Sequence, residues 1–149
     1  MTTEECRIQM ADNASAEHDA ILRAVQVLES ALASPASGRE EAWSRRVAHD
    51  LSPVVAAVVD HCRAAEAPGG LIREIEVFLG RHRVQTRASE EHRRLATEAE
   101  DFLSALATEQ DAAIIRARAA DLTADLRAHQ AHEADLIYEA FVRDIGVGD

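Results

Sequence analysis

The fold follows from residues 115–140, which read IRARAADLTADLRAHQAHEADLIYEA. Side chains that suit a buried face recur here at steps of three and four residues, the spacing of one face of an α-helix. They are Ile115, Leu122, Leu126, His129, Glu133, Leu136 and Ala140. The stretch therefore predicts a long helix, continuing to about Val142, that turns a histidine and a glutamate toward the core.

Three other stretches show the same periodicity, and each adds one histidine to its apolar face. The first, to about residue 33, carries His18, Ile21, Val25, Leu28 and Leu32. The second carries Trp43, Val47, Leu51, Val54, Val58 and His61. The third, ending near residue 107, carries His92, Leu95, Ala99, Phe102 and Leu106. Trp43 and Phe102 are interpreted as core residues.

Capping signals give the expected helix starts. Asp12 or Asn13 is expected to cap the first helix, Ser37 with Glu40 to form a capping box for the second, and Thr108 with Asp111 to start the last.

Proline and glycine give the expected breaks. Pro53 is expected to kink the second helix or to restart it with Ser52 as cap, and residues 67–70 (APGG) to end it. A short helix is expected over residues 71–79, with Gly80 after it.

Composition supports an all-α protein. Glycine (6), proline (3) and aromatic residues (3%) are scarce in the 149 residues, which favours helices over sheets. We expect an up-down-up-down antiparallel four-helix bundle with a short extra helix between helices 2 and 3. Residues 15–145 would form this single domain, after a flexible lead (1–14) and before a loose tail (146–149).

Charge and cysteine content narrow the function. The net charge is −11 and all basic residues are arginine, so nucleic acid and anionic membranes are poor partners. Cys6 and Cys62 suit free thiols in a reducing cytoplasm better than a disulfide. The start of the chain lacks a signal-peptide pattern, and no stretch is apolar enough to span a membrane. We therefore expect a soluble cytoplasmic protein.

The four core-facing histidines are expected to meet at one level of the bundle. Antiparallel neighbours place His18, His61, His92 and His129 at similar distances, about 23 to 32 Å at 1.5 Å per residue, from the opposite end. Such a layer is typical of a metal site, although ordinary hydrogen-bonded core histidines remain the alternative.

Rotation about each helix separates the other candidates. Glu133 lies about 40° from His129, whereas His132 lies about 60° to the other side and fits a ligand, an outer group or the rim. Glu66 lies about 140° from His61, so it ligates only if the last turn unwinds. His49 and His82 lie on polar stretches and are expected to be solvated. Tyr138 is expected in the core or on the surface rather than at the site rim.

Imidazole and carboxylate ligands favour iron or manganese over a thiolate zinc site. If Glu66 and Glu133 both bridge two octahedral ions, the protein fills about eight of the twelve coordination positions. About four would stay open for an oxo or hydroxo bridge and for water, dioxygen or peroxide. Glu-x-x-His, the ferritin-like di-iron signature, does not occur in the chain.

Residues 15 to 145 resemble the hemerythrin fold, specifically the bacterial HHE cation-binding domains. The resemblance rests on His18, His61 with Glu66, His92, and His129 with Glu133. It implies a non-haem di-iron centre, with those six residues as metal ligands, that binds dioxygen, peroxide or a related small oxidant in a redox, detoxification or sensing role.

The sequence departs from the family at three alanines. The family spaces its second-helix pair by four residues, but position 65 is Ala65, and Ala88 and Ala96 flank His92 where hemerythrins proper have a further histidine. A simple oxygen carrier is therefore disfavoured, and a reactive or mononuclear site gains weight. The alternatives are a non-catalytic iron-sensing or protein-interaction module of the same fold, and a metal-free bundle.

Overall fold

This computed structural model describes residues 2–79 and 82–143, which form helices joined by short connections and contain no strand. Its elements are α1 (Thr3–Ala33), α2 (Glu40–Glu66), α3 (Leu71–Leu79), α4 (His82–Ala105), α5 (Ala112–Tyr138) and a π-helical turn, η1 (Glu139–Arg143). The predicted all-α class and the short helix between the second and third long helices are confirmed.

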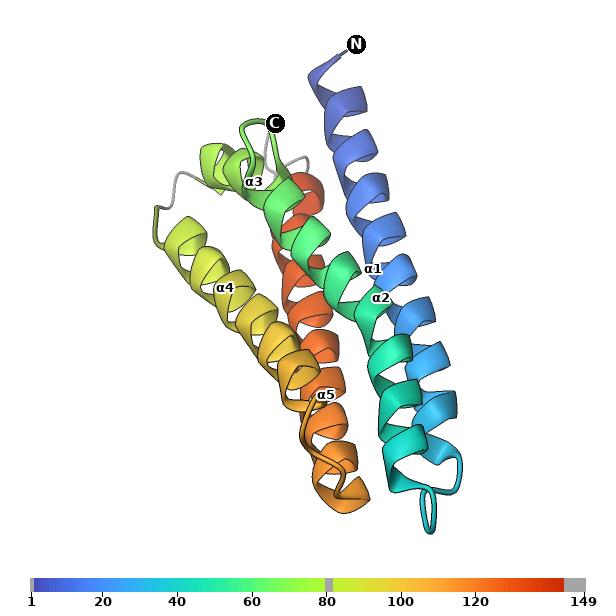
Figure 1. The fold of residues 1–149 in the computed structure, drawn as a ribbon. Coiled ribbons are helices and arrows are strands. Elements are labelled where there is room, and N and C mark those ends of the chain that lie inside the picture. The colour runs from blue at the N-terminus through green and yellow to red at the C-terminus, as the bar shows by residue number, and fades with distance from the viewer. Residues whose placement is uncertain (1, 80–81, 144–149) are drawn as a thin grey trace.

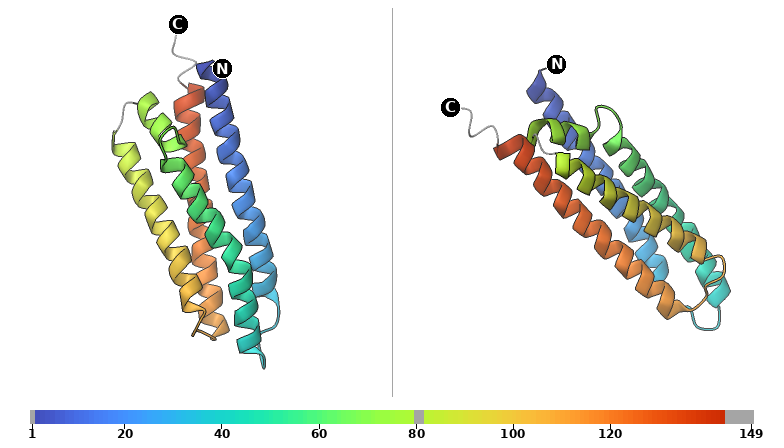
Figure 2. Two further views of the ribbon diagram at one scale, coloured as in Figure 1. Left: turned by 45° about the horizontal axis from the view of Figure 1, so that its top comes forward. Right: turned by 90° about the vertical axis from the view of Figure 1, so that its left-hand side faces the viewer.

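The four long helices lie alongside one another (Figures 1 and 2). Figure 1 shows the α1–α2 and α4–α5 connections at one end of the molecule, while α3 lies at the other end near the start of α1. Helix α3 contacts α1, α2, α4 and η1. We call this the α3 end, and it is where the candidate site lies.

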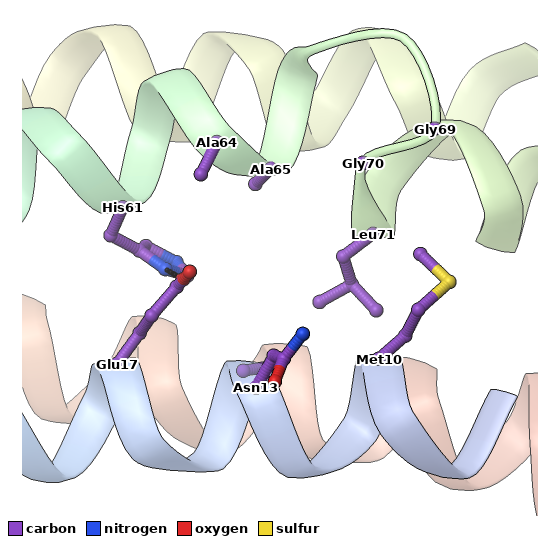
Figure 3. Close-up of a pocket in the computed structure, with 10 residues that line it drawn as sticks. Met10, Asn13, Glu17, His61, Ala64, Ala65, Gly69, Gly70 and Leu71 are labelled. Atoms are coloured by element: carbon purple, nitrogen blue, oxygen red, sulfur yellow. Dashed lines mark hydrogen bonds and ion pairs between the residues drawn. The ribbon is translucent and has the colours of Figure 1, made fainter. Parts of the chain in front are cut away.

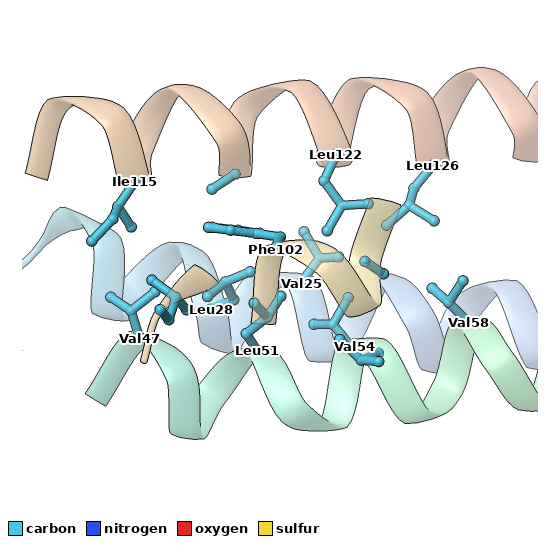
Figure 4. Close-up of a cluster of buried hydrophobic side chains, with 14 of the residues drawn as sticks. Val25, Leu28, Val47, Leu51, Val54, Val58, Phe102, Ile115, Leu122 and Leu126 are labelled. Atoms are coloured by element: carbon cyan, nitrogen blue, oxygen red, sulfur yellow. The ribbon is translucent and has the colours of Figure 1, made fainter. Parts of the chain in front are cut away.

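One apolar core runs between the long helices (Figure 4). Trp43 and Phe102 are each 1% exposed within it, which confirms both as core residues. Burying a large apolar side chain contributes about 1.5 to 3 kcal/mol, so this core dominates the stability of the fold. Toward the α3 end the core finishes in a layer of Ile21, Val58, Leu95 and Leu126.

Helix α1 begins ten residues earlier than the predicted cap at Asp12 or Asn13, and that prediction was wrong. Thr2 is the N-cap: its hydroxyl accepts a hydrogen bond from the Glu5 amide (3.1 Å), and the Glu5 carboxylate accepts one from the Thr2 amide. This capping box satisfies amides that would otherwise lack partners. Within the added turns, Met10 packs against the cluster that Ala14 forms with residues of α3 and η1.

The predicted capping box at the start of α2 was also wrong. Arg39 is the N-cap and makes no side-chain cap, whereas Glu40 accepts a hydrogen bond from the Gly38 amide (2.9 Å). Gly38 has a φ of 79°, a left-handed conformation that glycine adopts without steric cost.

Helix α2 passes through Pro53 without a restart, so Ser52 is not a cap. The Ser52 hydroxyl instead donates to the Ala48 carbonyl at 3.1 Å. As predicted, the helix ends before residues 67–70.

The final helix starts and ends near its predicted limits. Asp111 is the N-cap and accepts hydrogen bonds from the Ala113 and Ile114 amides, while Thr108 bonds back to Ala105 instead. The α-helical geometry ends at Tyr138, and the π-helical turn carries the chain onward. Gly80 and residues 146–149 lie outside the described part.

Candidate metal centre

Four buried histidines, one from each long helix, form a layer directly above the core at the α3 end. Each histidine lies three residues along its helix from Ile21, Val58, Leu95 or Leu126. Residues three apart share one face of a helix, so each histidine also points into the bundle. Their exposed fractions are 7% for His18, 3% for His61, 0% for His92 and 6% for His129. The structure therefore brings together the four histidines that the sequence predicted.

The four rings converge on one atom, Oε2 of Glu133. Its distances to the Nε2 atoms are 2.6 Å for His129, 3.1 Å for His61, 3.5 Å for His18 and 3.7 Å for His92. Glu133 itself is 1% exposed. One potential ligand atom from each of His18, His61, His129 and Glu133 lies within 4.8 Å of all the others, and His92 stands beside this most compact set.

Two further carboxylates hold the outer nitrogens of two rings. Oε2 of Glu17 lies 2.6 Å from Nδ1 of His61, and Oε1 of Glu91 lies 2.6 Å from Nδ1 of His129. An ionised carboxylate can only accept, so each Nδ1 carries the proton and each Nε2 presents a lone pair to the centre. Carboxylates in this outer position fix the tautomer and orientation of histidines that bind metals.

This tautomer makes the centre electron-rich. The Nε2 atoms of His61 and His129 are 3.3 Å apart and both face Oε2 of Glu133, so lone pairs would oppose one another unless a proton or a metal ion lay between them.

Several buried atoms also lack partners. They are Nε2 of His18, both ring nitrogens of His92 and Oε1 of Glu133, which have no hydrogen-bond partner among the described residues. Buried polar atoms normally have one. The donor set therefore fits a metal ion.

The pKa directions agree with a site built for a cation. Burial raises the pKa of Glu133, but the surrounding rings of His129, His18, His61 and His92 outweigh it and hold that pKa far below its usual range. Burial lowers the pKa of His61, yet contacts with Glu133 and Glu17 leave it above its ordinary value. The cluster thus favours positive charge at its centre.

Glu66 is the one predicted ligand that does not join the convergent atoms. Its Oε1 lies 4.0 Å from Nδ1 of His92, the ring nitrogen opposite the one that faces Glu133. Its side chain is 38% exposed. Helix α2 stays regular through Glu66, so the unwinding that would swing it inward does not occur.

His132 occupies an outer position beside the site. Its Nδ1 lies 3.2 Å from Oε2 of Glu91, and its side chain is 40% exposed. Together with His129 it lowers the pKa of Glu91 against the effect of burial. His49 and Tyr138 are exposed, and the side chain of His82 lies outside the described part.

A chamber of about 190 Å³ adjoins the site between α1, α2 and the start of α3 (Figure 3). Glu17 and His61 face each other at one end of it, and Met10 and Leu71 lie at the other. Ala65 contributes only a methyl group to the wall. The space suits a small ligand or several water molecules next to the metal-binding residues.

Sequence reasoning missed Glu17 and Glu91, although a signal was present. Each directly precedes a core histidine, giving the dipeptides Glu17-His18 and Glu91-His92 at the same place in the first helix of each helix pair. The rotation between adjacent residues turns each carboxylate away from its own neighbour and toward the histidine of the next helix.

Comparison with known proteins finds no matching family model, and neither a curated protein nor a solved structure matches the chain. Among the described residues, no helix combines the length and the apolar character that crossing a membrane requires.

Proposed function

We propose that this protein is a hemerythrin-like iron protein that binds dioxygen, peroxide or a related small oxidant. The observation that carries the proposal is the convergence of four imidazole Nε2 atoms on one buried carboxylate, with partnerless atoms facing the same point. Nitrogen and oxygen donors without a thiolate suit iron. An up-down-up-down helix order is part of the proposal, and the placement of the connections in Figure 1 supports it.

In this proposal the metal ligands are His18, His61, His92, His129 and Glu133. Bound iron would supply a Lewis-acidic, redox-active centre that keeps at least one position free for an exogenous ligand.

The protein's own residues prepare that centre. Glu17 and Glu91 accept the Nδ1 protons of His61 and His129 and so keep both Nε2 atoms available. The apolar layer of Ile21, Val58, Leu95 and Leu126 excludes water from the core side.

A small oxidant would approach from the opposite side, through the chamber. Glu17 lines it while bonded to His61, so this partly exposed carboxylate could accept a hydrogen bond from a ligand there. The proposal includes a cytoplasmic location, as the acidic composition and free thiols suggest.

The test is metal analysis of protein purified from iron-supplemented cells, with absorption spectra before and after peroxide. We expect bound iron and a spectral change on oxidation. His61→Ala and His129→Ala should lose the metal, while His49→Ala, which removes an exposed histidine of α2, should retain it.

Two outcomes would change this conclusion. Wild-type protein that takes up no metal, with His61→Ala and His129→Ala unchanged in stability, would refute the metal function. Bound iron that neither dioxygen nor peroxide affects would favour the sensing or interaction role instead.

A further inference from the structure

Three alanines and one glutamate form the layer on the α3 side of the histidines. One helical turn from each histidine toward that end, the residues are Ala14, Ala65, Ala88 and Glu133. All four are buried, with exposed fractions of 4% or less. The layer on the core side is wholly apolar, so Glu133 is the only potential metal ligand in the two layers that enclose the histidines.

The three alanines pack in two buried clusters, one on each side of the chamber. Ala65 and Ala88 pack together with Ile72 of α3, and Ala14 packs with Leu71 and η1. Ala14 and Ala65 also line the same chamber as His61. A second ion on this side would face a methyl group at three of these four positions, and the oxygens nearest to it there, on Asn13 and Glu17, lie on the α1 wall of the chamber.

The direction of the side chains makes position 65 decisive. Side chains in a helix tilt toward its N-terminus, so Glu133 of α5 reaches back to His129, four residues earlier. Ala65 of α2 bears the same relation to His61, whereas Ala14 and Ala88 precede their histidines and tilt away. Only position 65 could supply a second internal carboxylate, and it holds alanine.

The spacing of the donor atoms matches one ion. Nitrogen ligands at about 2.1 Å from a single ion lie roughly 3.0 to 3.4 Å apart, from right-angled to tetrahedral geometry. The Nε2 atoms of His61 and His129 are 3.3 Å apart, and those of His61 and His18 lie 3.1 and 3.5 Å from Oε2 of Glu133, in or close to this range. The Nε2 atoms of His129 and His92, at 2.6 and 3.7 Å from the same oxygen, lie a few tenths of an ångström outside it.

The balance of charge at the site also favours one ion over two. One divalent ion would meet a single negative charge at its centre, from Glu133, with Glu17 and Glu91 close behind two rings. Two ions would double the positive charge in a buried space that offers no second carboxylate ligand, and uncompensated buried charge is costly.

We propose that the centre holds a single iron ion, with Glu66 outside the coordination sphere. The ligands are His18, His61, His92, His129 and Glu133, and the free position faces the alanine layer and the chamber. This inference rests on the proposed function and replaces the pair of irons bridged by Glu66 that the sequence suggested.

The experiment is anaerobic titration of metal-free protein with Fe(II), followed by calorimetry and by metal analysis after gel filtration. We expect one ion per chain. After oxidation, an isolated high-spin ferric ion gives an EPR signal, whereas a coupled ferric pair has none at low temperature. We expect the signal to account for all bound iron.

Two matched pairs of variants locate the ligands. Glu66→Ala should keep one ion and lose no more than about tenfold in affinity, while Glu133→Ala should lose more than about 100-fold. Ala65→Glu places a second carboxylate against the chamber and should raise the number of ions to two. Ala56→Glu adds the same charge to α2 at an exposed site away from the chamber and should leave it at one.

The results separate this inference from the proposed function. Two ions per wild-type chain, or a loss of bound metal in Glu66→Ala as severe as in Glu133→Ala, would overturn the single-ion site and leave the iron function standing. No uptake of Fe(II) by the wild type would remove both. Because wild type and Glu66→Ala already decide the question, an Ala65→Glu variant that failed to fold would not affect it.

Discussion

Removing the Glu133 carboxylate should destabilise the protein even when no metal is present. In Glu133→Ala, the histidine layer loses the acceptor on which all four Nε2 atoms converge. In the metal-free protein a proton on Nε2 takes the place of the metal ion, and two of those contacts, at 2.6 and 3.1 Å, have hydrogen-bond length. Hydrogen bonds to a charged group contribute about 1.5 to 3 kcal/mol each, so the gross loss is about 3 to 6 kcal/mol.

Desolvation offsets part of this loss, because the variant no longer buries a carboxylate that is 1% exposed in the wild type. We therefore expect a net decrease of about 3 kcal/mol in the free energy of unfolding. For a chain of this size, that corresponds to a melting temperature lower by about 6 to 12 °C.

The assay is urea denaturation in the presence of a chelator, followed by far-ultraviolet circular dichroism. Glu133→Gln keeps the length of the side chain and one acceptor oxygen, so it should lose less than half as much stability. A Glu133→Ala variant within about 0.5 kcal/mol of wild type, the size of an ordinary surface effect, would refute the described arrangement of the metal-free cluster.

Three other properties can be predicted from the structure. Burial and the hydrogen bond that its protonated carboxyl donates to Asp125 raise the pKa of Glu98 to about 7. The stability that its protonated form contributes is complete below about pH 4.5 and is lost as the pH rises through 7. Because solvent screens this partly exposed group, the free energy of unfolding should fall by no more than about 1 kcal/mol across this window. Urea titrations at several pH values should show the fall in wild type and its absence in Glu98→Gln. A Cβ at Gly70 would overlap three backbone carbonyl oxygens, so Gly70→Ala should lower the free energy of unfolding by about 1 to 3 kcal/mol. A melting temperature equal to that of wild type, measured by calorimetry, would contradict this. Burial raises the pKa of the Cys62 thiol to about 12, whereas Cys6 is exposed, so a maleimide should label one thiol in native protein and both in urea, as mass spectrometry would show.

Periodicity within single helices predicted much of the site, because one face of a helix determines both burial and direction. His18, His61, His92 and His129 continue the apolar stripes of their helices, and all four are buried together. Glu133 was found in the same way.

The outer carboxylates depend on how two helices face each other, which no single stripe encodes. Glu17 lies off the apolar face of α1 and reaches His61 only because α2 packs beside it at the right rotation. Glu66 was predicted to reach the metal because the break at residues 67–70 was expected to unwind the last turn of α2. That turn stays helical, so Glu66 keeps its outward direction. The start of α1 was missed because the turns before Asp12 pack on α3 and η1, which lie far away in the sequence.

The repeated Glu-His dipeptide has a consequence for assembly. The α1–α2 pair supplies His18 and His61 with the supporting Glu17, and the α4–α5 pair supplies His92 and His129 with the supporting Glu91. Each half of the chain thus carries two imidazoles and one supporting carboxylate, and neither half can complete the ligand set alone. Under the proposed metal function, retention of an ion would therefore report correct folding, since only a chain whose two helix pairs have packed in the correct register brings the four imidazoles together.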